Sequence, residues 1–143
     1  MDFGATYDGW HSDMTRTVCV GKPSDKMESV YETVLTAQLS ALDAVKAGMS
    51  GKALDKIARD IITEAGYGDN FGHSLGHGVG VEIHESPYAS PSREDILPEN
   101  SIVTVEPGIY LEGKFGVRIE DFVVVTENGC INMTKAPKEL ICL

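Results

Sequence analysis

The sequence predicts an α+β domain built on an antiparallel sheet, and three observations carry this prediction. Residues 1–20 alternate around an Asp8-Gly9 dipeptide, a strong signal for a β-hairpin. Apolar residues recur at helical spacing in two segments between residues 24 and 66. Residues 101–143 carry runs of β-branched side chains. Hairpin, helices and strands follow one another in blocks, which favours one α+β domain over an alternating α/β fold.

The predicted hairpin brings two aspartates to one face. If Asp8-Gly9 is a two-residue turn, the numbers of paired residues add up to 17, so Asp2 lies opposite Thr15 and Gly4 lies opposite Asp13. Asp2 and Asp13 then project from the same face with Cα atoms about 7–8 Å apart, and Gly4 leaves open space beside Asp13. Two such carboxylates either surround a cation or are solvated strand residues, and the hairpin alone does not distinguish these readings.

Two helices are predicted next. The first follows Pro23-Ser24, with Ser24 as N-cap, and ends at Gly48; the second follows Ser50 and ends at Gly66. Their apolar faces contain Met27, Val30, Tyr31, Val34, Ala41, Leu42 and Val45 in the first helix, and Leu54, Ile57, Ala58, Ile61 and Ile62 in the second.

The remainder of the chain is predicted to be loop and strand. Residues 86–100 are rich in Ser, Pro and charge and are expected to form a loop. Strands are expected over residues 101–106 and about 116–126, followed by a turn at Asn128-Gly129 and a short strand ending near Leu143.

Composition excludes several classes of protein. The formal charge of −10 argues against a nucleic-acid-binding surface. No stretch is long and apolar enough for a membrane span, and the N-terminus lacks a signal-peptide pattern. Three widely spaced cysteines without a CxxC pair are typical of a reduced, cytoplasmic protein with inert thiols.

Three of the four histidines lie within twelve residues: His73, His77 and His84. Neutral imidazole is a common ligand of transition metals. Glycines on both sides of His77 permit a close backbone approach or a positive φ. A single histidine is more often structural, but three in a glycine-rich stretch favour a functional site.

The predicted C-terminal strands supply two further carboxylates. Glu106 ends an apolar strand, and Glu120 lies within a β-branched run, where it shares a face with Arg118 by the two-residue period. A carboxylate among apolar neighbours is costly unless it is paired or bound to a metal. The alternative is an ion pair on an edge strand. Four carboxylates combined with imidazole form a donor set that suits Mn²⁺, Co²⁺, Fe²⁺ or Zn²⁺, and the lack of a cysteine in this set argues against a structural zinc site.

Four motifs in order resemble the pita-bread metallopeptidases, the family of methionine aminopeptidase, prolidase and creatinase. The motifs are Asp2-Phe3-Gly4-Ala5 with Ser12-Asp13-Met14-Thr15-Arg16-Thr17, Gly76-His77-Gly78-Val79-Gly80, Val105-Glu106-Pro107-Gly108 and Arg118-Ile119-Glu120-Asp121. Residues 1–143 look like the C-terminal part of the catalytic domain of a bacterial Xaa-Pro aminopeptidase or Xaa-Pro dipeptidase. The resemblance implies a curved antiparallel sheet with helices on its outer face, and an N-terminal portion that is missing here.

The resemblance also implies a set of metal ligands. Asp13 and Glu120 match residues that bridge two divalent ions, Asp2 matches a ligand of one ion, and His77 and Glu106 match ligands of the other. Mn²⁺ or Co²⁺ is the expected metal, with Zn²⁺ or Fe²⁺ as alternatives.

Catalytic roles follow from the same resemblance. Glu106 is expected to act as general acid and base. His73 and His84 match histidines that contact the substrate and the developing tetrahedral intermediate, and Arg118 matches a residue that orients the site. The implied substrates are peptides with proline at the second position.

Two other interpretations remain at this level. The fold can serve as a non-catalytic domain that binds peptides or a partner protein, or the chain is an inactive fragment of the peptidase. Loss of upstream strands would leave an exposed sheet edge and favour a homodimer. The sequence does not distinguish the native metal, a dipeptidase from an aminopeptidase, or the oligomeric state.

Overall fold

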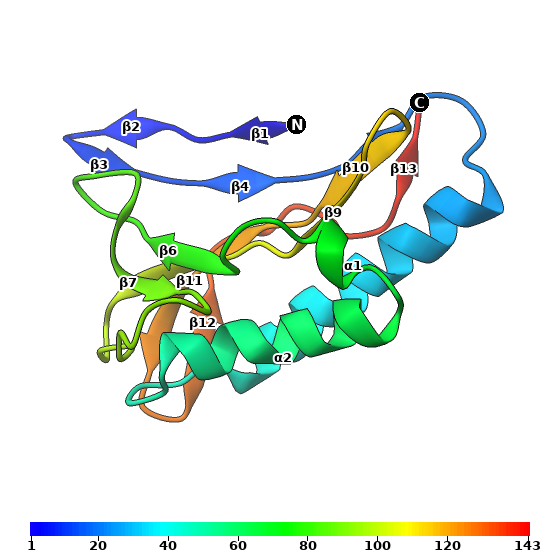
Figure 1. Cartoon of the computed structure of the whole chain (residues 1–143). Helices are drawn as coiled ribbons and strands as arrows, with labels where there is room; N and C mark the ends of the chain where they lie inside the picture. The colour runs from blue at the N-terminus through cyan, green and yellow to red at the C-terminus, as the bar shows by residue number, and fades with distance from the viewer.

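The computed structural model describes residues 1–143 and contains two long helices, one short 3₁₀ helix and thirteen short strands (Figure 1). The N-terminal strands are β1 (Asp2–Phe3), β2 (Thr6–Tyr7), β3 (Trp10–His11), β4 (Met14–Thr15) and β5 (Val18–Cys19). The helices are α1 (Asp25–Ala44), α2 (Gly51–Glu64) and the 3₁₀ helix η1 (Gly68–Asn70). The remaining strands are β6 (Gly76–Gly78), β7 (Glu85–Ala89), β8 (Ile102–Val105), β9 (Gly108–Leu111), β10 (Phe115–Arg118), β11 (Asp121–Thr126), β12 (Gly129–Asn132) and β13 (Ile141–Cys142).

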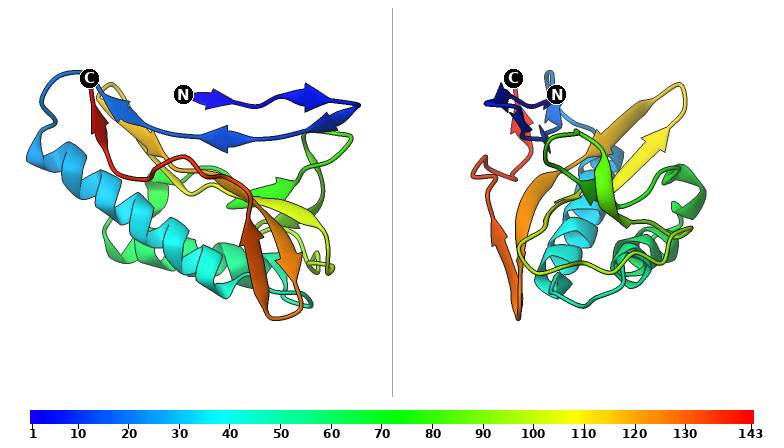
Figure 2. Two further views of the ribbon diagram at one scale, coloured as in Figure 1. Left: turned by 180° about the vertical axis from the view of Figure 1, so that it is seen from behind. Right: turned by 90° about the vertical axis from the view of Figure 1, so that its left-hand side faces the viewer.

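The largest sheet is antiparallel and has the strand order β12-β11-β8-β6-β7. The two long helices lie side by side on one side of this sheet, and the N-terminal hairpin lies on the other (Figures 1 and 2). The core fills the space between helices and sheet, where Val30, Val34 and Leu54 meet Val103 and Val123, all 0% exposed. Each such side chain contributes about 1.5–3 kcal/mol when fully buried. The predicted α+β class is confirmed.

The predicted hairpin register is also confirmed. Asp2 pairs with Thr15 and Tyr7 pairs with Trp10, so the same register runs along the hairpin. Asp8 and Gly9 have φ values of 49° and 80°, as a type I′ turn requires. The prediction that Gly4 leaves open space beside Asp13 is wrong.

Gly4 allows the two hairpin strands to approach each other closely, because it has no side chain. A Cβ atom on Gly4 would lie 1.8 Å from the Ser12 carbonyl oxygen. The backbone of the opposite strand therefore occupies the space that a side chain at this position would need.

Both helices start where the sequence predicts. The hydroxyls of Ser24 and Ser50 accept hydrogen bonds from backbone N–H groups three residues on, as N-caps do. The first helix ends at Ala44 instead of Gly48, because the backbone leaves the helical region at Val45 (φ −57°, ψ 126°). No helix in the chain combines the length and hydrophobicity needed to cross a membrane.

Three predictions in the C-terminal half are wrong. The expected loop 86–100 begins with most of strand β7, which pairs with β6 at the edge of the sheet. The turn after β11 occupies Glu127-Asn128, one residue earlier than predicted. The expected strand 116–126 is two strands, because β10 pairs with β9 while β11 pairs with β8 and β12.

Candidate metal centre

The break between β10 and β11 positions Glu120. Its backbone N–H donates to the carbonyl of Thr15 at 3.1 Å, in an isolated bridge to strand β4. Its carboxylate accepts a hydrogen bond from the Thr15 hydroxyl at 2.7 Å and is almost fully buried. The alternative of an ion pair between Arg118 and Glu120 is not found, since Arg118 forms its ion pair with Asp2.

A polar cavity of about 430 Å³ lies between the hairpin and the sheet. Its lining comes from the hairpin, from β6 and the segment between β6 and β7, from the residue that follows β8, and from the end of β10 with the segment after it. All five predicted metal ligands line it, together with Arg118 and His84: Asp2, Asp13, His77, Glu106 and Glu120.

The ligand atoms are closest around His77. Its Nε2 atom lies 3.1 Å from Glu106 Oε1 and 3.7 Å from Asp13 Oδ2. One ligand atom each from Asp13, His77 and Glu120 lies within 4.8 Å of the others. The Nδ1 atom of His77 is 3.0 Å from the Gly78 carbonyl oxygen, so a proton on Nδ1 leaves the Nε2 lone pair free for a cation.

Asp2 lies at the edge of this group. Its side chain is 58% exposed and forms an ion pair with Arg118. It is not among the ligand atoms that cluster with His77. Arg118 also donates to the Thr15 hydroxyl at 3.0 Å and lies 4.0 Å from a Glu106 carboxylate oxygen. Its guanidinium group thus connects the hairpin side of the cavity with the sheet side.

The electrostatics of the cavity favour a bound cation. Burial, followed by repulsion from Glu106, raises the pKa of Glu120 to about 8. Burial is also the largest cause of the raised pKa of Asp13, and Glu106 and Asp2 add to it. Burial is the largest single influence on His77 and acts to lower its pKa, but the hydrogen bonds to Glu106 and to the Gly78 carbonyl, together with the negative charges of Glu106 and Asp13, outweigh it and the pKa is raised. A cluster of carboxylates that resists ionisation fits divalent cations, because their positive charge would remove this repulsion.

His84 and His73 occupy different places. The ring centroid of His84 is 4.2 Å from that of His77, and His84 lines both the main cavity and an adjoining one of about 420 Å³. His73 lines the adjoining cavity alone, where its Nε2 atom is 2.9 Å from the Tyr110 hydroxyl. The two cavities share four residues: His77, His84, Glu106 and Arg118.

Sequence reasoning missed several residues around the cavity. His11 lines the main cavity, with Nδ1 3.2 Å from the Gly80 carbonyl oxygen. The two-residue strand period places His11 on the same face as Asp13 and was a usable signal. The predicted register placed Thr15 opposite Asp2, but its hydrogen bond to Glu120 was not predicted. Tyr110 could not have been found, because strand β9 was not predicted.

A buried ion pair on α2 holds the histidine segment. Asp55 is 1% exposed and pairs with Arg59 at 2.7 Å. Asp55 accepts the backbone N–H of Leu75 at 2.9 Å, while Arg59 donates to the carbonyls of Phe71 and His73. We call Asp55 and Arg59 the α2 clamp. It fixes the backbone that carries His73 and leads into β6.

The fold and this cavity define a class of protein: a pita-bread domain with a carboxylate-rich, histidine-containing site. The sequence model described as "Metallopeptidase family M24" matches residues 1–127. The chain therefore belongs to metallopeptidase family M24.

Individual relatives support this family assignment. The chain is 54% identical over 141 residues to the Xaa-Pro dipeptidase of Pyrococcus furiosus, covering 99% of this chain and 40% of that protein. The crystal structure of the X-Pro aminopeptidase from Thermotoga maritima matches with a TM-score of 0.96 and 54% identity, over 99% of this chain and 40% of that one. The Xaa-Pro dipeptidase from Bacillus anthracis matches with a TM-score of 0.97 and the same identity and coverages. The chain thus spans about 40% of the length of these relatives, in their C-terminal part.

Proposed function

We propose that the protein to which this chain belongs hydrolyses the peptide bond between an N-terminal residue and a following proline, with two divalent cations as cofactors. The convergence of four carboxylates and one imidazole on a single cavity is the observation that carries the proposal. The Xaa-Pro dipeptidase and X-Pro aminopeptidase relatives support the substrate class. A domain that only binds peptides does not need this donor set.

For the cations we propose that Asp13 and Glu120 would contribute to holding both ions, Asp2 to holding one, and His77 and Glu106 to holding the other. The 3.1 Å contact between His77 and Glu106 and the grouping of Asp13, His77 and Glu120 support this assignment. The carboxylate majority suits Mn²⁺ or Co²⁺, and Zn²⁺ or Fe²⁺ also accept this donor set. When bound, the two cations would polarise the scissile carbonyl and lower the pKa of a water molecule.

The chain's own residues then move protons and orient the substrate. Glu106, with a side chain 12% exposed beside His77, is proposed as the general base and acid that delivers a proton to the leaving proline nitrogen. His84 and His73 are proposed to contact the substrate and donate to the developing oxyanion from the two adjoining cavities. Arg118 is proposed to orient Asp2 and Glu106, because its guanidinium group lies beside both.

Metal content and cleavage together test the proposal. We expect about two divalent ions per chain after loading with Mn²⁺ or Co²⁺ and removal of free metal, as in other two-metal hydrolases. The loaded protein should cleave Ala-Pro but not Ala-Ala, and EDTA should abolish cleavage. A protein that retains no divalent ion would support the binding-domain interpretation. Two bound ions without cleavage would mean that residues 1–143 hold the metals but lack part of the site.

A further inference from the structure

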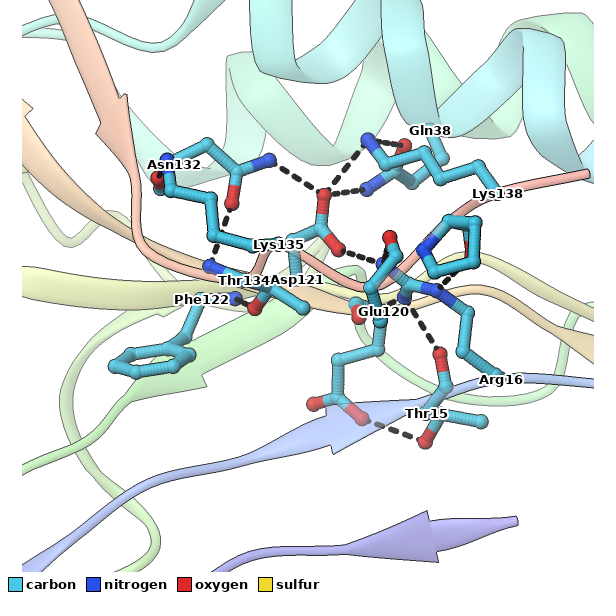
Figure 3. A network of polar contacts seen from close by, with 12 residues as sticks. Thr15, Arg16, Gln38, Glu120, Asp121, Phe122, Asn132, Thr134, Lys135 and Lys138 are labelled. Atoms are coloured by element: carbon cyan, nitrogen blue, oxygen red, sulfur yellow. Dashed lines mark hydrogen bonds and ion pairs between the residues drawn. The ribbon is translucent and has the colours of Figure 1, made fainter.

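Glu120 and Asp121 are adjacent in the sequence, and their side chains point in different directions (Figure 3). Glu120 lines the cavity, whereas Asp121 is 0% exposed and points away from the cavity toward α1 and the C-terminal segment. A carboxylate buried this deeply is costly unless it is fully paired.

Four side chains surround Asp121. Arg16 and Lys138 each approach one of its oxygens at 2.7 Å. The amides of Gln38 and Asn132 donate to it at 3.1 and 2.6 Å. Although burial acts in the opposite direction, these donors lower the pKa of Asp121, with Lys138 and Arg16 foremost among them. Asp121 is thus an anion enclosed by cations and amides that come from three different parts of the chain.

Arg16 uses its whole donor set in this network. A guanidinium group has five N–H donors in a planar fork. Arg16 donates once to Asp121 Oδ1 at 2.7 Å and otherwise to four backbone carbonyls, those of Thr15, Glu120, Ala136 and Pro137, at 2.6–2.9 Å. A lysine could not replace it, because an ammonium group has three donors and no planar fork.

These contacts reach the cavity through the backbone. Arg16 donates hydrogen bonds to the carbonyls of Thr15 and Glu120, the two residues of the isolated bridge. Asp121 accepts a hydrogen bond from the same guanidinium group. On the cavity side the Thr15 hydroxyl donates to the Glu120 carboxylate. Thr15 thus links the Glu120 carboxylate to a buried network in which Arg16 and Asp121 do not line the cavity.

We infer that Arg16 and Asp121 are positioning residues for Glu120, which they hold in the orientation needed to bind a cation together with Asp13 and His77. This inference rests on the proposed function. It also brings in the C-terminal segment, because Asn132, Ala136, Pro137 and Lys138 lie beyond the residues 1–127 matched by the family model.

The test is Mn²⁺ affinity, measured by isothermal titration calorimetry on the whole chain. We expect Asp121→Asn to weaken Mn²⁺ binding about 10–100-fold, as loss of a group that orients a metal ligand typically does. Lys138→Met removes a partly exposed partner and should weaken binding less while leaving the chain folded. The control is Ile62→Ala, a core truncation on α2 outside the network, which should lower the melting temperature but change the affinity less than about twofold.

The outcomes separate the inference from the proposed function. If the unsubstituted chain binds Mn²⁺ and both network variants bind it with unchanged affinity, the network is structural only and the inference is wrong. If Asp121→Asn does not fold, Lys138→Met decides: weakened binding by the folded variant supports the inference, and unchanged binding overturns it. If the unsubstituted chain binds no divalent ion, the proposed function and the inference both fail.

Discussion

At the scale of single residues, the site is a place where three side chains hold protons more tightly than they do in an unfolded chain. The pKa values of Asp13, His77 and Glu120 are all raised, that of Glu120 from 4.5 to about 8. A raised pKa in the folded state stabilises the fold below the unfolded value, and this stabilisation is lost as the pH rises through the folded value.

The metal-free chain should therefore lose stability between about pH 4.5 and about pH 8, the window set by Glu120. The lowered pKa of Asp121 acts outside this window, because it matters only near and below its ordinary value of 3.8. With added Mn²⁺ the stability should instead increase with pH over this range, since metal and proton compete for the same carboxylates. Melting curves in EDTA and in Mn²⁺ across this range check the prediction, with Glu120→Gln as the variant whose slope should flatten. A melting temperature in EDTA that rises through the window would contradict it.

His84 allows a second prediction at this scale. If it donates to the oxyanion, His84→Ala should lower kcat about 10²–10³-fold in the metal-loaded enzyme while leaving the metal content unchanged. Steady-state kinetics with an Xaa-Pro peptide, read beside elemental analysis, measure both quantities. An unchanged kcat would assign His84 a structural role. Loss of metal would instead mean that its contact with the His77 ring supports the ligand.

At the scale of elements, α2 offers two ion pairs with the same i,i+4 spacing in opposite surroundings. The α2 clamp of Asp55 and Arg59 has side chains 1% and 25% exposed, whereas Lys56 and Asp60 are 71% and 53% exposed. Because the clamp is buried, removing one partner leaves an unpaired charge in the interior and strongly destabilises the fold.

Asp55→Ala should thus lower the free energy of unfolding by about 3 kcal/mol, the lower end of the range for a broken buried pair because Arg59 keeps some exposure. The matched control Lys56→Ala should change it by less than about 1 kcal/mol, because a solvent-exposed pair contributes little. Urea unfolding of the metal-free chain measures both. Similar losses in the two variants would show that the clamp is not a stability determinant.

At the scale of the whole molecule, the hairpin presents apolar side chains to solvent. Phe3, Tyr7 and Trp10 are 55%, 86% and 59% exposed, and β1 and β2 are each paired on one side only. An unpaired strand edge beside exposed aromatic residues favours association with another strand.

We expect the isolated chain to form a homodimer through this hairpin as its concentration rises. Light scattering coupled to gel filtration measures the mass, and the double variant Tyr7→Thr, Trp10→Thr keeps a high strand propensity while removing the aromatic surface. The variant should stay monomeric where the parent dimerises. A parent chain that is monomeric at every concentration would disprove the expectation.

Local features of the sequence predicted a large part of this molecule. The Asp8-Gly9 turn determines the hairpin register, and thereby places Asp2 and Asp13 on one face, because a two-residue turn leaves no freedom in the pairing. The caps Ser24 and Ser50 are equally local signals. The five candidate ligands were predicted from residue type and motif, and all of them line one cavity.

Tertiary structure alone decided the rest. Nothing local reveals that β10 and β11 separate at Glu120, because the break arises from pairing with strands that lie far away in the sequence. The partners of Asp121 come from α1, from the segment after β4 and from the C-terminal segment, and the α2 clamp reaches forward to Leu75. The sequence by itself therefore predicted which side chains line the cavity, whereas long-range packing decided which buried ion pairs hold their backbone in place.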